Sequence, residues 1–389
     1  MVLRVLVVAL SFCLMANQIR AEENIQIGYL EQSVPRPPIL SNLDEIPENE
    51  GFAGAEIGLS DNTTTGKFLG HNYALQKQII EEGGDVLAAA QAMLKESPYL
   101  LLNAPQEIIS QIAKLPEAEN ALLFNVSSRE TKLRGEACSA NLLHTMPSRT
   151  MLSDALAQFS VKKRWSKWAL IHGAYDADKS YLAALEKSAK KFGVAIVEKK
   201  QWNFDADMRR NAAQEVPLFT QDFPNHDMMV IADERGDFGR YVIYNTWIPR
   251  PIAGSEGVVP SAWSASVEQH GAAQLQSRFY KEYGRQMRPI DYAAWAAVRT
   301  VGEAVTRTNS ADLDAVKSYI LSDEFALGGF KGRPLTYRKW NGQMRQPIVL
   351  SHARAVVAIA PLDGFLHQRN ELDTLGLDQA ESSCATFTE

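Results

Sequence analysis

The stretch from residue 148 to 197 constrains the fold of this chain more than any other. Apolar residues recur at helical spacing between Met151 and Phe159 and again between Leu182 and Phe192, with a short apolar run at 168–171 between them. Gly193 follows the second periodic segment, as a C-terminal cap does, and another apolar run begins next to it. The order helix, strand, helix, strand predicts a βαβ unit, which needs parallel strands covered by helices.

The same alternation extends along most of the chain. Short apolar runs predict strands at 25–30, 99–102, 121–124 and 228–231, and periodic segments predict helices at 86–94, 272–283, 292–306 and 311–321. Strands that alternate with helices indicate an α/β protein. The length suggests two domains, and no low-complexity linker separates them, so the chain is expected to cross between its domains more than once.

The first 21 residues predict export. Residues 2–16 are almost wholly apolar, Arg4 lies near the start, and Ala21 suits a cleavage site. The apolar run is shorter than the ~20 residues that a membrane-spanning helix needs. We therefore expect a cleavable signal peptide at 1–21 and a soluble, exported mature protein.

The charge balance argues against nucleic acid as a partner. The chain carries 40 Lys and Arg residues against 46 Asp and Glu residues, a formal net charge of −6, and removal of the signal would take away Arg4 and Arg20. An acidic protein is poorly suited to nucleic acid or to an anionic membrane surface.

Two cysteines, Cys138 and Cys384, remain after the expected processing. In an oxidising compartment they either form one bridge, which would tie the C-terminal tail to the body, or stay as free thiols. A chain of this length can bury a large core without a disulfide, so the sequence leaves both states open.

No motif for catalysis is present. The sequence has no G-x-S-x-G, H-E-x-x-H or C-x-x-C motif and no Walker loop, and its seven histidines form no ligand pair at helical spacing. We expect no catalytic residues, no metal ligands and no cofactor, which favours a binding protein over an enzyme.

Candidate binding residues follow the predicted strands, because open α/β sheets bind ligands at the carboxyl ends of their strands. They are Tyr29, Asn103, Ser127, Ser128, Tyr175, Asp233 and Glu234. The serines offer hydroxyl and backbone N–H groups, and the tyrosines offer aromatic faces for a small ligand or a cation. The two carboxylates suit either an ammonium group or a metal ion, and the sequence does not choose between them.

Four segments carry a resemblance to a known family: IQIGYLE, PSRTMLSDALAQF, ALIHGAYDADKSY and MMVIADE. Together with the export signal they resemble type I periplasmic solute-binding proteins of ABC transporters, above all the branched-chain amino-acid (Leu/Ile/Val) binding proteins. More narrowly, the chain resembles the subgroup associated with PQQ-dependent alcohol dehydrogenase systems. The resemblance extends over most of the mature chain and is specific for the fold but not for the ligand.

This resemblance implies two Rossmann-like lobes joined by a three-segment hinge. Lobe 1 would comprise residues 22–145 and 255–331, and lobe 2 residues 146–254 and 332–389. The ligand would lie in the cleft between them, and carry-over by position adds Glu31 and Ala104 to the candidate binding residues. It also implies a monomeric receptor that captures a small polar solute by hinge closure and delivers it to the permease and ATPase subunits of an ABC transporter.

The chain departs from the amino-acid binders near its start. The stretch GAEIGLSDNTTTGKFLGHNY stands where the family has a helix and a glycine-rich turn, and the serine/threonine pair that holds an amino acid is not clearly placed. The ligand is therefore left open between an amino acid, an alcohol-derived metabolite and a metal species such as a lanthanide or its chelate. A ligand-sensing protein that uses the same cleft is the alternative to a transport receptor.

Overall fold

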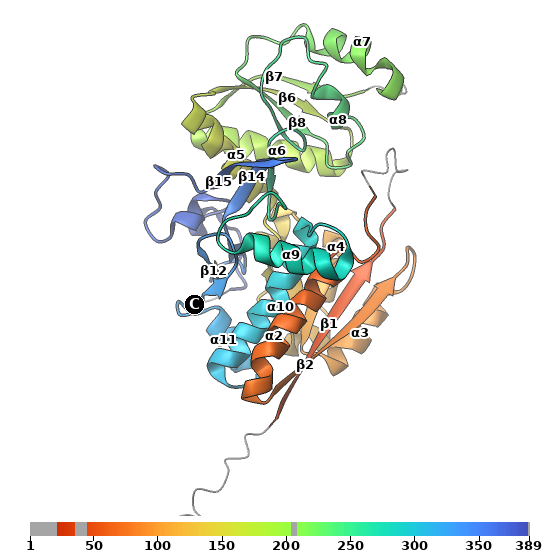
Figure 1. Ribbon diagram of the computed structural model, residues 1–389, viewed down its shortest axis with the longest axis vertical. Helices are drawn as coiled ribbons and strands as arrows, with labels where there is room; N and C mark the ends of the chain where they lie inside the picture. Colours follow the sequence, from red (N-terminus) through yellow and green to blue (C-terminus); the bar gives the residue numbers. More distant parts are fainter. Residues whose placement is uncertain (1–21, 36–44, 204–207, 388–389) are drawn as a thin grey trace, which may run out of the picture.

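The computed structural model describes residues 22–35, 45–203 and 208–387, and the predicted signal peptide at 1–21 lies outside them. The chain forms two α/β lobes stacked along the long axis of the molecule (Figure 1). Each lobe has a parallel sheet with helices on both faces, so the predicted pair of Rossmann-like lobes is confirmed. No helix of the described ranges is long and apolar enough to cross a membrane.

The first lobe contains a five-stranded parallel sheet in the order β2-β1-β3-β4-β5. Its strands are β1 (Glu23–Gln32), β2 (His71–Ile80), β3 (Tyr99–Asn103), β4 (Leu122–Asn125) and β5 (Leu142–His144). The central strands β3 and β4 are buried on both faces. This two-sided burial explains why they stand in the sequence as continuous apolar runs without alternation.

Helices cover both faces of this sheet. On one face lie α3 (Val86–Glu96) and α4 (Gln106–Ile112), and on the other lie α2 (Phe52–Leu69), α9 (Ala272–Tyr283), α10 (Pro289–Thr308) and α11 (Leu313–Ile320). Gly54 lets α2 approach α10, because an added Cβ would lie 1.8 Å from the carbonyl oxygen of Asp291. The stretch that departs from the family sequence pattern therefore still forms a helix against α10.

The second lobe contains a four-stranded parallel sheet in the order β7-β6-β8-β9. Its strands are β6 (Lys167–His172), β7 (Ala195–Gln201), β8 (Met228–Ala232) and β9 (Ile252–Gly254). Helices α5 (Arg149–Lys163) and α6 (Asp176–Phe192) cover one face, and α7 (Met208–Thr220) and α8 (Gly239–Val242) cover the other.

The predicted order helix, strand, helix, strand over 148–197 is confirmed as α5, β6, α6 and β7. Ser148 caps α5, since its hydroxyl oxygen accepts the N–H of Met151 at 3.3 Å. Gly193 ends α6 in the left-handed conformation with a φ of 72°, as its place after the periodic segment predicts.

Two small antiparallel sheets lie where the lobes meet. Strands β10 (Val259–Ser261), β14 (Ile348–His352) and β15 (Ala355–Ala360) form one of them, and it packs on α5. Strands β11 (Leu327–Gly328), β12 (Pro334–Tyr337) and β13 (Met344–Arg345) form the other, and its apolar side chains join the core of the first lobe. This arrangement places the three crossings between the lobes near residues 146, 262 and 346.

The lobe boundaries expected from the sequence stay a proposal. Leu335, Tyr337 and Met344 pack in the first core, although the expectation assigns 332–389 to lobe 2. Strand β10 pairs with β14, which gives Ile348 and Leu350 to the second core and Val349 to the first, so the two lobes share this sheet.

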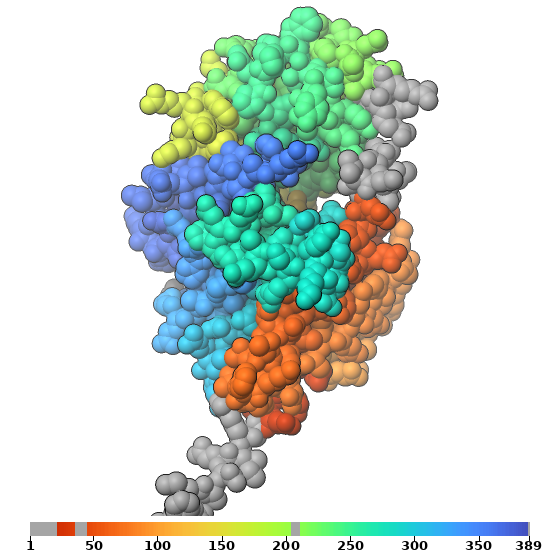
Figure 2. All heavy atoms as spheres, in the orientation of Figure 1, coloured from red at the N-terminus to blue at the C-terminus, as the bar shows by residue number. Residues whose placement is uncertain are grey.

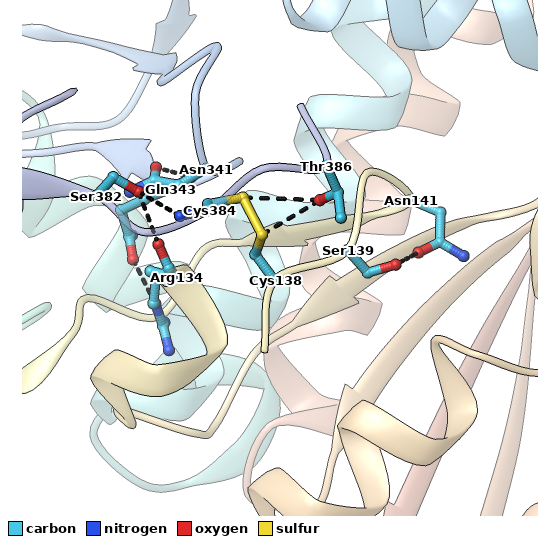
Figure 3. Close-up of a disulfide and its surroundings, with 9 residues drawn as sticks. All are labelled: Arg134, Cys138, Ser139, Asn141, Asn341, Gln343, Ser382, Cys384 and Thr386. Atoms are coloured by element: carbon cyan, nitrogen blue, oxygen red, sulfur yellow. Dashed lines mark hydrogen bonds between the residues drawn. A yellow bond between two sulfur atoms is a disulfide. The ribbon is translucent and has the colours of Figure 1, made fainter. Parts of the chain in front are cut away.

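The C-terminal tail after β15 returns to the first lobe. Cys384 forms a disulfide with Cys138, which lies between η3 (Thr131–Arg134) and β5, with a Cα–Cα distance of 5.6 Å (Figure 3). In the space-filling view, the blue C-terminal segments fill one side of the junction between the lobes (Figure 2). Of the two states that the sequence left open, the structure has the bridged one.

Candidate functional site

A cleft of about 500 Å³ lies between the two lobes. Its first-lobe wall consists of residues at the carboxyl ends of β1, β3 and β4, and its second-lobe wall includes the start of α5 and the loop after β8. Six of the nine predicted residues line it: Glu31, Asn103, Ala104, Ser127, Ser128 and Glu234. The lining also contains residues that the sequence did not single out, among them Gln32, Glu50, Gln106, Glu107, Arg129, Glu130, Arg149 and Ile290.

Tyr29 lies behind the cleft wall and not in it. The residue is fully buried, and its hydroxyl accepts a hydrogen bond from the side-chain amide of Asn103 at 3.0 Å. Burial raises the pKa of Tyr29 well above its usual value, and the neighbouring Glu31 carboxylate adds to the effect. The hydroxyl therefore stays neutral and orients Asn103, so Tyr29 supports the wall from inside the core.

Asp233 is also turned away from the cleft. One oxygen of its carboxylate accepts the N–H groups of Gly236 and Asp237, at 2.9 and 3.2 Å, and the other accepts those of Phe238 and Gly239, at 2.9 and 2.7 Å. These four bonds close the loop after β8. The prediction placed Asp233 at a strand end correctly, but its carboxylate is occupied by this loop and does not line the cavity.

Tyr175 is likewise outside the cavity lining. It precedes α6 as its N-cap residue, and the guanidinium of Arg235 stacks on its ring at 3.9 Å from the centroid. The residue is 44% exposed. Tyr175 and Arg235 therefore form a surface pair on the second lobe, next to the loop that carries Glu234.

Arg149 is the central residue of the second-lobe wall, and the sequence analysis missed it. Its Nε donates to Glu234 at 2.9 Å, one terminal nitrogen pairs with the same carboxylate, and the other pairs with Glu130 of the first lobe. Burial alone would lower the pKa of Arg149, but the two carboxylates raise it above its usual value. Arg149 thus stays charged and joins the two lobes at the base of the cleft.

One signal in the sequence points to Arg149. It is the first residue of α5, directly after the Ser148 cap. A cation in the first helical turn opposes the helix dipole, so it needs carboxylates nearby. The position of Arg149 in the first helical turn thus predicts carboxylate partners from elsewhere in the chain. The sequence pattern does not identify those carboxylates.

Asp178 holds Glu234 in place. Its carboxylate is fully buried and accepts the backbone N–H of Glu234 at 2.7 Å and that of Tyr175 at 3.2 Å. A single aspartate therefore ties the start of α6 to the loop after β8. This link fixes the backbone from which Glu234 reaches Arg149.

Three backbone donors of the first-lobe wall, those of Ala104, Ser127 and Ser128, are already used within the protein. The side-chain oxygen of Asn125 accepts the N–H groups of Ser127 and Ser128, at 3.2 and 2.8 Å, and the hydroxyl of Ser127 accepts that of Ala104 at 3.1 Å. The expectation that the two serines offer free N–H groups to a ligand is therefore wrong. The side chain of Asn125 therefore closes the turn that carries Ser127 and Ser128.

Carboxylates outnumber cations around the cleft. Five glutamates line it, Glu31, Glu50, Glu107, Glu130 and Glu234, against the two guanidinium groups of Arg129 and Arg149. Among the residues that the structure describes, no three or more His, Cys, Asp or Glu side chains are arranged to hold a metal ion. The cleft is thus an acidic, polar cavity suited to binding a small molecule.

Comparison with known proteins places the fold. A family model described as a periplasmic binding protein matches residues 68–213. A branched-chain amino acid ABC transporter periplasmic ligand-binding protein from Burkholderia xenovorans aligns with a TM-score of 0.71 and 14% identity, over 94% of this chain and 100% of that one. No curated protein matches the chain.

Two further solved structures show the same fold with different ligands in their descriptions. A leucine-, isoleucine-, valine-, threonine- and alanine-binding protein from Brucella ovis, in a closed conformation, has a TM-score of 0.67 and 15% identity, over 93% of this chain and 99% of that one. A solute-binding protein from R. palustris in complex with benzoate has a TM-score of 0.62 and 11% identity, with the same coverage. The fold of this chain is therefore the type I periplasmic binding protein fold.

Proposed function

We propose that this protein is a periplasmic solute receptor of an ABC transporter. It would capture a small polar solute in the cleft between its lobes and deliver the solute to a membrane permease and its ATPase. The observation that carries the proposal is the polar cavity of about 500 Å³ whose walls come from both lobes. The matching fold of solute-binding proteins supports it, and the periplasmic location rests on the predicted signal peptide.

Hinge closure is the proposed mechanism. A ligand that touches both walls binds the closed form more tightly than the open one, and that difference shifts the equilibrium toward closure. Arg149 is placed to assist, because its guanidinium contacts Glu130 of the first lobe and Glu234 of the second. Closure would bury this ion pair further and strengthen it.

The cleft favours a solute that donates hydrogen bonds over one that presents a carboxylate. The N–H groups of Ala104, Ser127 and Ser128 already have partners inside the protein. Glu130 and Glu234 pair with Arg149, and Glu50 pairs with Arg288, but carboxylates still outnumber cations among the lining residues. An organic solute is also favoured over a metal species, because the described part of the chain has no suitable cluster of ligands. The link to PQQ-dependent alcohol oxidation stays a prediction from sequence resemblance.

Thermal melting of the mature monomer with a panel of solutes tests the proposal. The panel contains leucine, alcohol-derived acids, protonated amines and a lanthanide salt. A true ligand at a hundred times its Kd stabilises the protein by about 2.7 kcal/mol. We expect a saturable rise in Tm for at least one organic solute, together with a smaller radius of gyration in solution scattering.

Two variants test whether a ligand found in the panel binds in the cleft. Glu31→Gln and Asn103→Ala change lining residues and should weaken binding at least tenfold, while Arg354→Gln, an exposed residue of the β14–β15 turn, should not. Binding that is unchanged in both cleft variants would contradict the proposal. A separate experiment distinguishes transport from sensing, which use the same cleft. Capture of a permease by the ligand-bound protein would support transport.

A further inference from the structure

A second cavity, of about 420 Å³, lies on the tail side of the hinge. One wall belongs to the β12–β13 hairpin, with Lys339, Trp340 and Arg345, and the other belongs to the C-terminal tail, with Arg369 and Gln379. The cavity is thus built from two segments that only the tertiary structure brings together.

The charge of this cavity is opposite to that of the cleft. Three cations line it, and the acidic residue in its lining, Asp323, already pairs with Lys339 at 2.9 Å. Arg345 is held rigidly, because its Nε donates to Asp373 at 2.8 Å and one terminal nitrogen donates to the carbonyl of Tyr337 at 2.7 Å. Its other terminal nitrogen makes no hydrogen bond to any residue that the structure describes.

Trp340 forms part of the hairpin wall of the cavity. The residue is 8% exposed, and the guanidinium of Arg345 lies 5.1 Å from the centre of its ring. Its indole nitrogen is itself inaccessible, so Trp340 contributes a ring beside which Arg345 lies and not a hydrogen-bond donor for a ligand.

We propose that this cavity is a second binding site, for a small oxyanion with two or more negative charges, such as a polycarboxylate or a phosphate. Arg345 and Lys339 would hold the anion on the hairpin side, and Arg369 would hold it on the tail side. Charge-assisted hydrogen bonds from guanidinium groups to oxyanions are among the strongest in proteins. The bound anion would join the tail to the hairpin and so reinforce the tail side of the hinge.

The disulfide is part of this site's construction. Cys384 lies between two residues of the cavity wall, Gln379 and Phe387, and its bond to Cys138 anchors that part of the tail to the first lobe. The tail wall is therefore held in position before the anion arrives. Such preorganisation lowers the entropic cost of binding.

The experiment measures binding of citrate and of inorganic pyrophosphate to the mature protein by calorimetry and by thermal melting at constant ionic strength. We expect saturable binding and a rise in Tm. The double variant Lys339→Gln/Arg369→Gln should bind on the order of tenfold more weakly or not at all. Both side chains are exposed, so the variant should fold normally.

Two controls keep the result interpretable. Lys190→Gln/Arg354→Gln removes the same charge from exposed positions outside the cavity and should leave anion binding unchanged. Comparing the two anions distinguishes a carboxylate preference from a phosphate preference. The proposal is overturned if neither anion binds, or if both double variants lose affinity equally, since a non-specific charge effect would then account for the result.

Discussion

The two sides of the hinge are built differently. On the cleft side, the lobes are joined across a polar cavity by the ion pair of Arg149 with Glu130. On the tail side, residues 371–377 lie between α5 of the second lobe and the β12–β13 hairpin of the first, and the tail ends in a disulfide. If the lobes close as proposed, we expect the cleft side to change its width and the tail side to keep it.

The tail side depends on buried charges that pair with each other and with backbone carbonyls. Arg338 is 1% exposed, and it donates to Asp373 at 2.9 Å and to the backbone carbonyl of Leu375 at 2.5 Å. Burial lowers the pKa of Arg338, and the Asp373 carboxylate opposes that shift. Asp154 of α5 holds the same segment from the other lobe, because it accepts the N–H of Gly376 at 2.7 Å.

The largest expected effect tests the tail side. Arg338→Met should lower the free energy of unfolding by about 3–5 kcal/mol, because it leaves several carbonyls and part of the Asp373 carboxylate buried without a partner. Urea denaturation measures it. Arg333→Met removes an exposed pair with Glu371 in the same region and should cost less than about 1 kcal/mol. If both variants lost the same free energy of unfolding, burial of the ion pair would not determine how much each substitution destabilises the protein.

The second prediction concerns the disulfide between Cys138 and Cys384. Cys138→Ser/Cys384→Ser should lower stability by about 2–5 kcal/mol, because the unfolded chain regains the freedom of a loop that spans 246 residues. The midpoint of thermal unfolding measures this loss. The wild-type protein after reduction should match the variant, and a reduced protein as stable as the oxidised one would contradict the prediction.

On the cleft side the expected effects are smaller. Arg149→Gln should destabilise the protein by about 1–3 kcal/mol, since Glu130 and Glu234 lose the cation that joins them. It should also reduce the change in scattering profile on ligand binding. Arg129→Gln is the matched control, because Arg129 is 37% exposed and lies 3.9 Å from Glu234. If both variants behave alike, Arg149 does not link the lobes.

The smallest expected effect is a pH dependence in the second lobe. Burial, with Asp233 beside it, raises the pKa of Asp237 to about 6. Between about pH 4 and 6 the Asp237 carboxyl is protonated in the folded protein and ionised in the unfolded chain. The free energy of unfolding therefore falls as the pH rises through this window. At pH 7.5, Asp237→Asn should therefore raise the free energy of unfolding by less than about 1 kcal/mol, since the group is partly exposed. The expected readout is a small rise in Tm.

The pH series itself provides the control for Asp237→Asn. At pH 4 both the wild-type and the variant side chains are largely neutral in the folded state. The difference in Tm between them should therefore vanish as the pH falls from 7.5 to 4. A difference that is constant across this range would mean that charge is not its cause.

Local patterns predicted the elements of the fold well. The helix predicted at 272–283 coincides with α9, and the strands predicted at 99–102 and 228–231 lie within β3 and β8. The pattern gave no strand for β2, which is only half buried, or for β14 and β15, whereas the aromatic and glycine-rich residues 325–340, which contain β11 and β12, indicate strands and turns. β2 lacks a continuous apolar run and depends on its partner β1 for stability.

The sequence located six of the residues that line the cleft, because strand ends are a local property and parallel sheets gather them at one edge. Asn103, Ser127 and Glu234 are in the lining for that reason. What those groups do was decided by tertiary contacts, since Asn125 uses the N–H groups of both serines and the loop after β8 uses the carboxylate of Asp233.

By itself, the sequence determined that parallel strands alternate with helices in an α/β chain, because hydrophobic periodicity is written residue by residue along each strand and helix. Only the tertiary structure decided that Arg149 bridges two glutamates, that the tail forms a charged cavity behind the hinge, and that Cys138 meets Cys384. Each of these depends on segments separated by tens to hundreds of residues, and no local pattern encodes the distance between them.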